Sequence, residues 1–203
     1  MKDRKEAILA FTAVEDIEAH MSDPSADAKG FWLKLAKAGA SERTISKAEA
    51  IEAALCCGWI DGQLDRFDEH YFLVRMTPRR PSSRWSAKNC ATAERLARDG
   101  RLNAAGLAEI EAAKRDGRWD SAYKSSRTAD VPDDLAAALA SDRAARRFFE
   151  TLDSANRFAI IYRVNDAKRA ETRAKRIAQY VEMCARGETI HPARTARKSV
   201  AKG

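Results

Sequence analysis

The sequence predicts an α+β fold, with a small antiparallel sheet and helices in the N-terminal part and a helical module at the C-terminus. Before residue 80, hydrophobic residues alternate with a period of two in several short segments, which is typical of strands. After residue 86 their spacing is the three-and-four spacing of helices. Pro78 and Pro81 separate the two regions, because proline lacks the amide hydrogen that regular structure needs. The chain has 203 residues, 45% of them hydrophobic, so it can bury a sizeable core.

The N-terminal part is expected to alternate strands with helices. We expect, in chain order, a strand over residues 5–13, a helix over 14–21, a strand over 30–38, a helix over 47–57 and two antiparallel strands over 59–63 and 70–77. Ser46 and Glu49 have the spacing of a capping box at the start of the helix 47–57, and Gly58 ends it. Trp59 and Trp85 are expected to be buried and close together, because tryptophan carries a large apolar surface.

The region after residue 86 is expected to be helical. Ser86 and Asn103 are the predicted N-caps of two helices, and Leu107 and Ile110 are expected to face the core from the second. Further along, Pro132 is expected at a first helical position. Three more N-caps are predicted at Ser141, Ser154 and Asn165. The helix after Asn165 is expected to run from residue 166 to 186, with an inward stripe of Ala170, Ala174, Ile177, Val181 and Cys184.

The chain is therefore expected to have three parts, an α+β domain over residues 1–128, a helical module over 129–190 and a basic disordered tail over 191–203. The net charge of +7 is unevenly distributed. Residues 142–203 hold 15 Lys and Arg against 7 Asp and Glu, whereas residues 1–141 hold 22 against 23. This excess permits an anionic partner, and a solvated helical surface is the simpler alternative.

The cysteine and histidine residues indicate no metal site. Cys56, Cys57, Cys90 and Cys184 lack the C-x-x-C spacing of zinc ligands, and the three histidines are scattered. We expect reduced thiols and no cofactor. The N-terminal segment has too few apolar residues for a signal peptide or a spanning helix. These features predict a cytoplasmic protein without membrane insertion, and they do not specify its oligomeric state.

The densest polar segment lies between Arg75 and Asn89, where five basic side chains occur without an acid. It runs from a strand end into a helix N-terminus, whose free N–H groups favour an anion, and arginine binds phosphate through paired hydrogen bonds. We therefore expect a site for an anionic small molecule. Its predicted residues are Asp61, Arg75, Arg79, Arg80, Ser83, Arg84, Trp85, Ser86 and Asn89. The alternative is a structural loop whose arginines pair with nearby aspartates and whose tryptophan fills the core.

No catalytic residue is assigned. Asp61 is expected to lie beside the arginine segment and would be a general base in an enzyme, although a structural ion pair is the simpler interpretation. The sequence contains no glycine-rich phosphate loop and no nucleophile elbow. We expect a binding protein rather than an enzyme. An enzyme acting on a phosphorylated or acidic small molecule is the alternative.

A second basic cluster lies in the expected C-terminal helix. Its residues are Lys168, Arg169, Arg173, Lys175 and Arg176. Arg169, Arg173 and Arg176 share a helix face with Tyr180, and Glu171 lies four residues before Lys175. Such a face would lie along a nucleic-acid backbone, so nucleic acid is an alternative partner. A solvated helix surface explains the same pattern more simply.

Six segments carry a resemblance to a known family. They are residues 54–62 (ALCCGWIDG), 77–89 (TPRRPSSRWSAKN), 100–102 (GRL), 105–107 (AGL), 133–135 (DDL) and 167–177 (AKRAETRAKRI). These segments resemble the bacterial YdeI/OmpD-associated family of bacteriocin-protection proteins, over roughly residues 30–187. Cys57 stands where the family often has an aromatic residue, and Leu102 where methionine is common.

The resemblance implies a soluble bacterial protein linked to envelope stress or to resistance against bacteriocins and cationic peptides. It implies no reaction and no catalytic residue, and any protection would be indirect. The combined expectation is a non-enzymatic, stress- or resistance-linked binding protein with an anion site at the loop Arg79–Ser86.

Overall fold

The computed structural model describes residues 6–23, 25, 29–124 and 129–192. The chain divides into two compact units, an N-terminal unit (Met1–Ala122) and a C-terminal unit (Tyr123–Gly203), and each is described by itself. This division lies at residue 122, whereas the sequence led us to expect a boundary at residue 128. The expected tail falls outside the described residues, apart from His191 and Pro192. The α+β fold class is confirmed.

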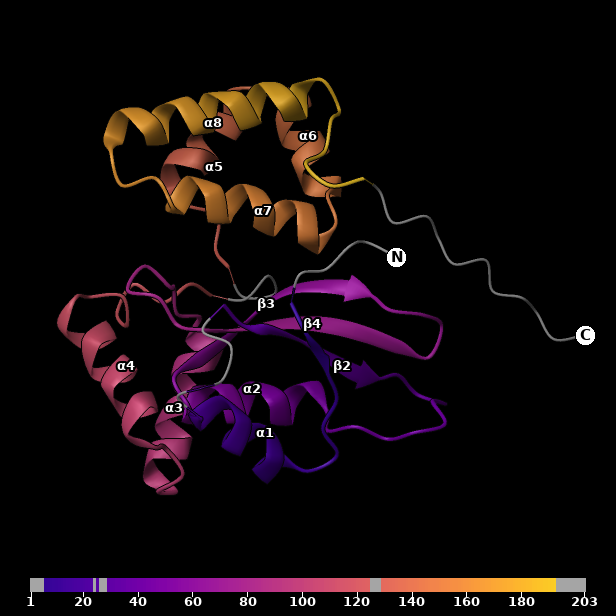
Figure 1. Ribbon diagram of the computed structural model, residues 1–203. Coiled ribbons are helices and arrows are strands. Elements are labelled where there is room, and N and C mark those ends of the chain that lie inside the picture. Colours follow the sequence, from indigo (N-terminus) through magenta and orange to yellow (C-terminus); the bar gives the residue numbers. More distant parts are fainter. Residues whose placement is uncertain (1–5, 24, 26–28, 125–128, 193–203) are drawn as a thin grey trace, which may run out of the picture. The chain divides into compact units, whose positions relative to one another are not determined.

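The described residues of the N-terminal unit form a four-stranded sheet with strand order β1-β2-β4-β3 (Figure 1). The strands are β1 (Ile8–Leu9), β2 (Phe31–Ala36), β3 (Trp59–Arg66) and β4 (Tyr71–Pro78). β4 pairs antiparallel with β3, as predicted, and also with β2. β1 is shorter than the expected strand 5–13 and runs parallel to β2. The sheet is therefore mixed rather than antiparallel, because a helical crossover between β1 and β2 returns the chain in the same direction.

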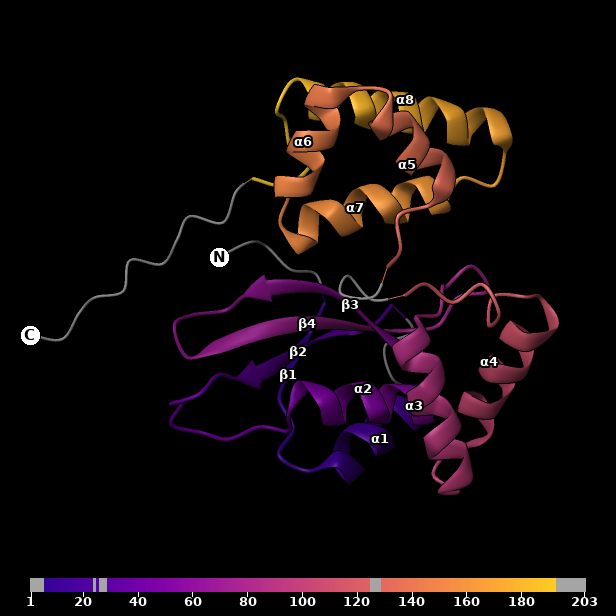
Figure 2. The same ribbon diagram turned by 180° about the vertical axis from the view of Figure 1, so that it is seen from behind.

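The N-terminal unit also contains, within the described residues, four helices. They are α1 (Val14–Ser22), α2 (Lys47–Cys56), α3 (Ala87–Arg98) and α4 (Ala104–Arg115). α1 and α2 cover one face of the sheet, and α3 packs beside α2 (Figures 1 and 2). Between these layers Phe31, Leu33 and Met76 of the sheet are buried against helix residues such as Ile17. Burial of these apolar side chains holds the layers together.

The predicted helix caps of this unit are confirmed. Ser46 and Glu49 form the capping box of α2. The side chains of Ser86 and Asn103 each accept a hydrogen bond from the amide three residues further on, at the starts of α3 and α4. Gly58 follows α2 with a positive φ of 74°, a conformation that favours glycine.

Leu107 was expected to face the core, but its side chain is 44% exposed. The inward face of α4 is formed instead by Gly106, Ile110 and Ala113, which are buried. A Cβ on Gly106 would lie 2.7 Å from the carbonyl oxygen of Leu55. The backbones of α4 and α2 therefore approach so closely that only glycine fits at position 106. This approach rotates Leu107 to the surface, because adjacent helix residues point about 100° apart.

The C-terminal unit is helical over its described residues, and no strand occurs between residues 129 and 192, as predicted. Its helices are α5 (Asp133–Ala140), α6 (Arg143–Thr151), α7 (Ser154–Asn165) and α8 (Ala170–Ala185). α8 contacts each of the other three (Figures 1 and 2). Leu135, Phe149, Ile160 and Cys184, one from each helix, belong to its buried core. The unit is therefore organised around a core of its own.

Two predicted N-caps of this unit are wrong by one residue. Asp142 and Asp153, rather than Ser141 and Ser154, cap α6 and α7. Each carboxylate accepts a hydrogen bond from the amide three residues further on, at 2.9 and 2.8 Å. Serine and aspartate are comparable N-caps, so a neighbouring pair of them does not specify the first helical residue.

The helix expected over residues 166–186 begins later than predicted. Asn165 is the last residue of α7 rather than an N-cap, and α8 begins at Ala170. The buried residues of α7 continue at helical spacing to Val164, which carries that helix through Asn165. Pro132 is likewise the N-cap of α5 rather than its first residue. Among the described helices, none is long and apolar enough to cross a membrane.

Candidate functional site

The predicted anion site lies on the loop that joins β4 to α3 in the N-terminal unit. The amide of Arg79 donates to the carbonyl of Gly58 at 3.0 Å, and the amide of Ser83 donates to the carbonyl of Arg80 at 2.7 Å. The amide of Arg80 donates in return to Ser83 Oγ at 2.9 Å. At the end of the loop, Ser86 caps α3. These hydrogen bonds hold the loop in a defined turn.

Arg79 is the buried member of this loop, with 7% of its surface exposed. Its Nη1 donates to the carbonyl of Arg84 at 3.3 Å, whereas Nε and Nη2 have no hydrogen-bond partner among the described residues. Burial lowers the pKa of Arg79 to about 10, because a desolvated cation is disfavoured. Arg79 is therefore a buried positive charge that is only partly compensated.

Two side chains from beyond the loop act on this charge. After burial, the carboxylate of Glu109 in α4 is the next influence and raises the pKa of Arg79, and the charge of Arg118 lowers it. Arg118 Nη1 donates to the carbonyl of Ser83 at 2.9 Å, and its Nε lies 2.8 Å from the Asp116 carboxylate. No local motif in the sequence marks Glu109 or Arg118, because only the fold brings them to the loop.

Trp59 and Trp85 are 5% and 2% exposed, which confirms the predicted burial. Both belong to the core of the N-terminal unit. Trp59 Nε1 donates to the carbonyl of Met21 at 3.0 Å. The ring centroid of Trp85 lies 4.8 Å from that of Trp119, and its Nε1 has no partner among the described residues. Trp85 therefore fills the core beneath the loop and is not available for direct ligand contact.

Two of the predicted site residues have partners away from the loop. Arg75 on β4 donates from Nε to Glu6 at 2.8 Å, and this hydrogen bond lowers the pKa of the Glu6 carboxyl. Asp61 on β3 lies 3.6 Å from Lys47 Nζ at the start of α2. Both pairs have the geometry of structural ion pairs, and the partner of Asp61 is a lysine rather than one of the loop arginines.

The accessible part of the predicted site is smaller. Arg80 on the loop and Lys88 in the first turn of α3 are exposed, and neither has an ion-pair partner among the described residues. Ser83, Arg84 and Asn89 are half-buried beside them. The backbone amide of Asn89 already donates to Ser86 Oγ at 3.1 Å. The surface available to an anion is therefore formed by Arg80, Lys88 and the beginning of α3.

The arginines of α8 face the C-terminal unit itself. Arg173 Nη2 donates to Asp134 Oδ1 at 2.8 Å. Arg176 Nη1 lies 3.3 Å from Asp166 Oδ2 and also donates to the carbonyl of Arg163. Tyr180, the fourth member of the predicted face, is buried. This face is therefore engaged within the unit rather than open to a nucleic-acid backbone.

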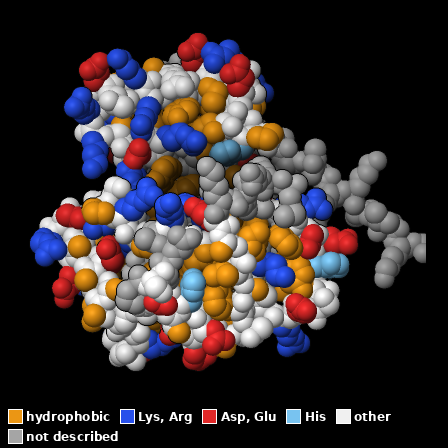
Figure 3. Space-filling view, in the orientation of Figure 1, with side chains coloured by type: hydrophobic (Ala, Val, Ile, Leu, Met, Phe, Trp, Pro, Cys, Tyr) orange, Lys and Arg blue, Asp and Glu red, His pale blue; other side chains and the backbone are white. Residues whose placement is uncertain are grey.

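The remaining basic residues of this cluster do not form a nucleic-acid-binding face either. Lys168 and Arg169 are exposed, while Lys175 pairs with Glu171 at 3.0 Å, in line with their predicted spacing. Figure 3 shows basic side chains over the N-terminal end of α8 with acidic side chains among them. This mixture favours a solvated helix surface over a nucleic-acid interface.

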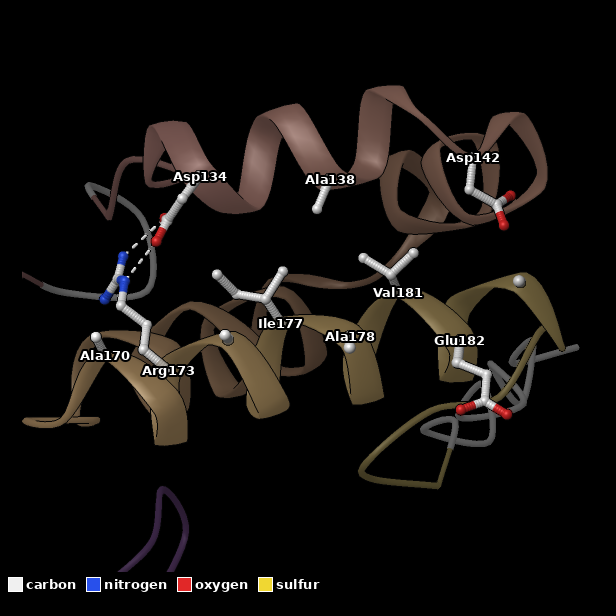
Figure 4. A pocket seen from close by; sticks show the side chains of 11 residues that line it. Asp134, Ala138, Asp142, Ala170, Arg173, Ile177, Ala178, Val181 and Glu182 are labelled. Carbon is white, nitrogen blue, oxygen red and sulfur yellow. Dashed lines mark hydrogen bonds and ion pairs between the residues drawn. The ribbon is translucent and has the colours of Figure 1, made fainter.

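A groove between α5 and α8, which the sequence did not lead us to expect, has a volume of about 690 Å³ (Figure 4). Ala170 and Ala174, expected to face the core, are exposed and line this groove. Cys184 of the expected stripe is buried, and Ile177 and Val181 are partly buried. Tyr180 and Cys184 direct α8 into the core and so leave its alanines beside α5. The feature of the sequence that could have indicated this groove is the series of alanines at helical spacing in α8.

No metal-binding group is formed within the described residues, since no three or more His, Cys, Asp or Glu side chains are placed together. The four cysteines are free and buried. Burial raises the pKa of the Cys56 and Cys90 thiols to about 11. A thiol with such a pKa is a poor nucleophile at neutral pH, so the cysteines have the character of core residues.

These features define a two-unit α+β protein that presents an arginine-rich loop on one unit and an apolar groove on the other. Residues 128–187 match a family described as "Bacteriocin-protection, YdeI or OmpD-Associated". The match lies within the C-terminal unit and confirms the resemblance to this family over that part of the chain.

The N-terminal unit matches a second family. Residues 9–109 match a domain of unknown function, DUF8412. The segments 54–62 and 77–89, which first suggested the resemblance, lie within this second match, so the match to the bacteriocin-protection family covers less of the chain than the expected 30–187. Comparison with curated proteins and with solved structures found no significant match.

Proposed function

We propose that this chain is a non-enzymatic binding protein, linked to bacteriocin protection or a related stress response, that holds a phosphate-sized anion at the loop Arg79–Ser86. The observation that carries the proposal is the buried and only partly compensated positive charge of Arg79. Two nitrogens of the buried Arg79 have no partner among the described residues. Arg118, which is itself paired with Asp116, contacts the Ser83 carbonyl of the same loop. An anion at the loop surface would offset this charge.

The basic residues would contribute in two ways. Arg79 is buried beneath the loop, so its guanidinium would attract the anion from a distance rather than contact it. Electrostatic interactions are less screened in the protein interior than in water. Arg80 is exposed and would bind the anion directly through paired guanidinium hydrogen bonds. The N-terminus of α3 adds a partial positive charge at the same place.

The biological role rests on the family match of the C-terminal unit. Protection would be indirect, through ligand binding in the cytoplasm. The four free, buried cysteines support a reducing compartment. Recovery of the protein from the periplasmic or secreted fraction of the bacterial cells that produce it would contradict this part of the proposal.

Isothermal titration calorimetry with inorganic phosphate and sulfate tests the anion site. We expect binding by the full chain and a loss of about tenfold in Arg80→Ala, because a charge-assisted hydrogen bond contributes roughly 1.5–3 kcal/mol. Arg98→Ala is the matched control, since Arg98 is an exposed arginine at the other end of α3. The proposal fails if the wild-type chain binds neither anion at millimolar concentration, or if both variants lose affinity equally.

A further inference from the structure

We propose that the groove between α5 and α8 binds an amphipathic helical segment of a partner protein. Aliphatic side chains of the partner would enter the groove, and a lysine or arginine would lie at the end marked by Asp142 and Glu182. This inference concerns the C-terminal unit alone and does not depend on the anion site.

The lining of the groove is apolar and built from small residues. Its middle is formed by Ala138 of α5 and by Ile177, Ala178 and Val181 of α8 (Figure 4). Its volume of about 690 Å³ falls in the range of about 300–1,000 Å³ typical of binding pockets. Alanine side chains on both walls let a partner backbone approach closely and leave the depth of the groove for larger partner side chains.

The walls of the groove favour a helix over an extended peptide. Both walls are α-helices, whose backbone amides and carbonyls are already hydrogen-bonded within each helix. An extended segment would find no backbone partners there, and burying its polar backbone groups without hydrogen bonds is costly. A helical segment satisfies its own backbone and presents anchors at positions i, i+4 and i+7. α5 has 8 residues, which is room for about two turns of the partner.

The charges of the groove differ between its two ends. At one end Asp134 is paired with Arg173, so the two charges cancel (Figure 4). At the other end Asp142 has no ion-pair partner among the described residues. The Arg186 guanidinium pairs with the carboxylates of both Glu182 and Glu188, at 2.6 and 3.1 Å. The three side chains together therefore carry one net negative charge. The lining of the groove at this second end therefore contains two carboxylates and no basic side chain.

The helix dipoles reinforce this difference. α5 and α8 both run from the paired end toward the Asp142 end (Figure 4). Their C-termini, at Ala140 and Ala185, therefore lie at the end whose lining carries the two carboxylates. Unpaired carbonyls at a helix C-terminus attract cations. The N-terminus of α6, a positive helix end, also lies there, and the Asp142 carboxylate that caps it offsets its charge. Charge complementarity thus selects a partner with its cationic residue at this end.

Fluorescence anisotropy with a labelled synthetic peptide tests this inference on the full chain. The probe is a helical peptide of about 14 residues with leucines at i, i+4 and i+7 followed by a lysine, and its analogue has glutamine in place of lysine. We expect Ala178→Trp to abolish binding, since Ala178 is exposed and a tryptophan there would fill the groove. Ala136→Trp is the matched control, because Ala136 is exposed on α5 outside the groove lining.

A second variant tests the charge selection without filling the groove. In Asp142→Asn/Glu182→Gln the asparagine retains an N-cap, so α6 remains capped. We expect this variant to bind the lysine peptide about three- to tenfold more weakly and the glutamine peptide as the wild type does. Equal binding of the lysine peptide by wild type, Ala178→Trp and the double variant would overturn the proposal, as would no binding by the wild type. If sedimentation shows that the wild type dimerises and Ala178→Trp does not, the occupant is a second copy and the proposal is wrong.

Discussion

The guanidinium carbon of Arg79 lies 3.6 Å from the centroid of the Trp85 ring. Arg79 is the first residue after β4, and Trp85 immediately precedes the N-cap of α3, so both ends of the arginine-rich loop share one buried contact. Trp85 also contacts Trp119, which follows α4. The loop is therefore part of the core of the N-terminal unit, and its effect on stability has to be separated from any effect on ligand binding.

Trp85→Ala should destabilise the N-terminal unit by about 3–5 kcal/mol, because it removes a buried aromatic ring and leaves a cavity under the loop. Urea unfolding followed by tryptophan fluorescence measures this change, since all four tryptophans lie in this unit. Leu107→Ala, at an exposed position of α4, should change stability by less than about 0.5 kcal/mol. A loss below about 1 kcal/mol for Trp85→Ala would show that the ring is not part of the core.

Gly106→Ala should destabilise the same unit by about 1–3 kcal/mol, although alanine is the better helix former. The added methyl group would clash with the carbonyl oxygens of Leu55 and Cys56 in α2. Gly62→Ala is the control, because its Cβ would have an ordinary contact of 3.4 Å with the Arg75 carbonyl oxygen. A stabilised Gly106→Ala variant in the same urea titration would mean that α4 does not approach α2 as described.

Asp142→Ala and Asp153→Ala should each destabilise the C-terminal unit by roughly 0.5–2 kcal/mol, the usual effect of losing an N-cap. Ser141→Ala and Ser154→Ala should have much smaller effects, because these residues do not cap α6 or α7. Far-UV circular dichroism is the appropriate probe, as this unit has no tryptophan. If the serine variants were instead the less stable ones, Ser141 and Ser154 would be the N-caps, as the sequence led us to expect.

The ion pair between Glu6 and Arg75 should make stability pH-dependent. The hydrogen bond from Arg75 lowers the pKa of the Glu6 carboxyl in the folded state. Its contribution to stability is therefore fully present above the pKa of glutamate in the unfolded chain, and it is lost as the pH falls through the lower folded pKa. Glu6→Gln should be less stable than the wild type at pH 7 and equally stable well below pH 4.

Glu111→Gln, which removes an exposed carboxylate from α4, is the control for the loss of one negative charge. Stability is measured by urea unfolding at a series of pH values and constant ionic strength. A constant difference between Glu6→Gln and the wild type across the whole series would show that the pair with Arg75 does not account for the pH dependence.

The features that the sequence predicted well depend on neighbours along the chain. The capping box of Ser46 and Glu49 involves residues three apart, and the period of two in β4 follows from the strand itself. The same holds for the family resemblance, which the match over residues 128–187 confirms. The serine–aspartate pairs at 141–142 and 153–154 are an instructive failure, because either residue caps a helix well and the choice depends on how α6 and α7 pack.

The candidate sites were harder to predict. Composition identified the arginine-rich loop, but it did not show that Arg79 is buried against Trp85 or that Arg118 joins the loop from beyond α4. Nor did composition show that Arg75 forms an ion pair with Glu6, or that Asp61 forms one with Lys47. These relationships join residues far apart in the chain, and the sequence carries no local pattern for them.

Periodicity and contacts between near neighbours along the chain were enough to predict the α+β class, the change to helices after the proline loop and the helix starts of the N-terminal unit. Which face each helix turns to the core depends instead on packing between distant parts of the chain. The close approach of α4 to α2 turned Leu107 outward, and the burial of Tyr180 placed the alanines of α8 along a groove beside α5. The physical reason is that a helix rotates about its axis until its best-packing face meets its neighbour, and that neighbour is supplied by a distant part of the chain.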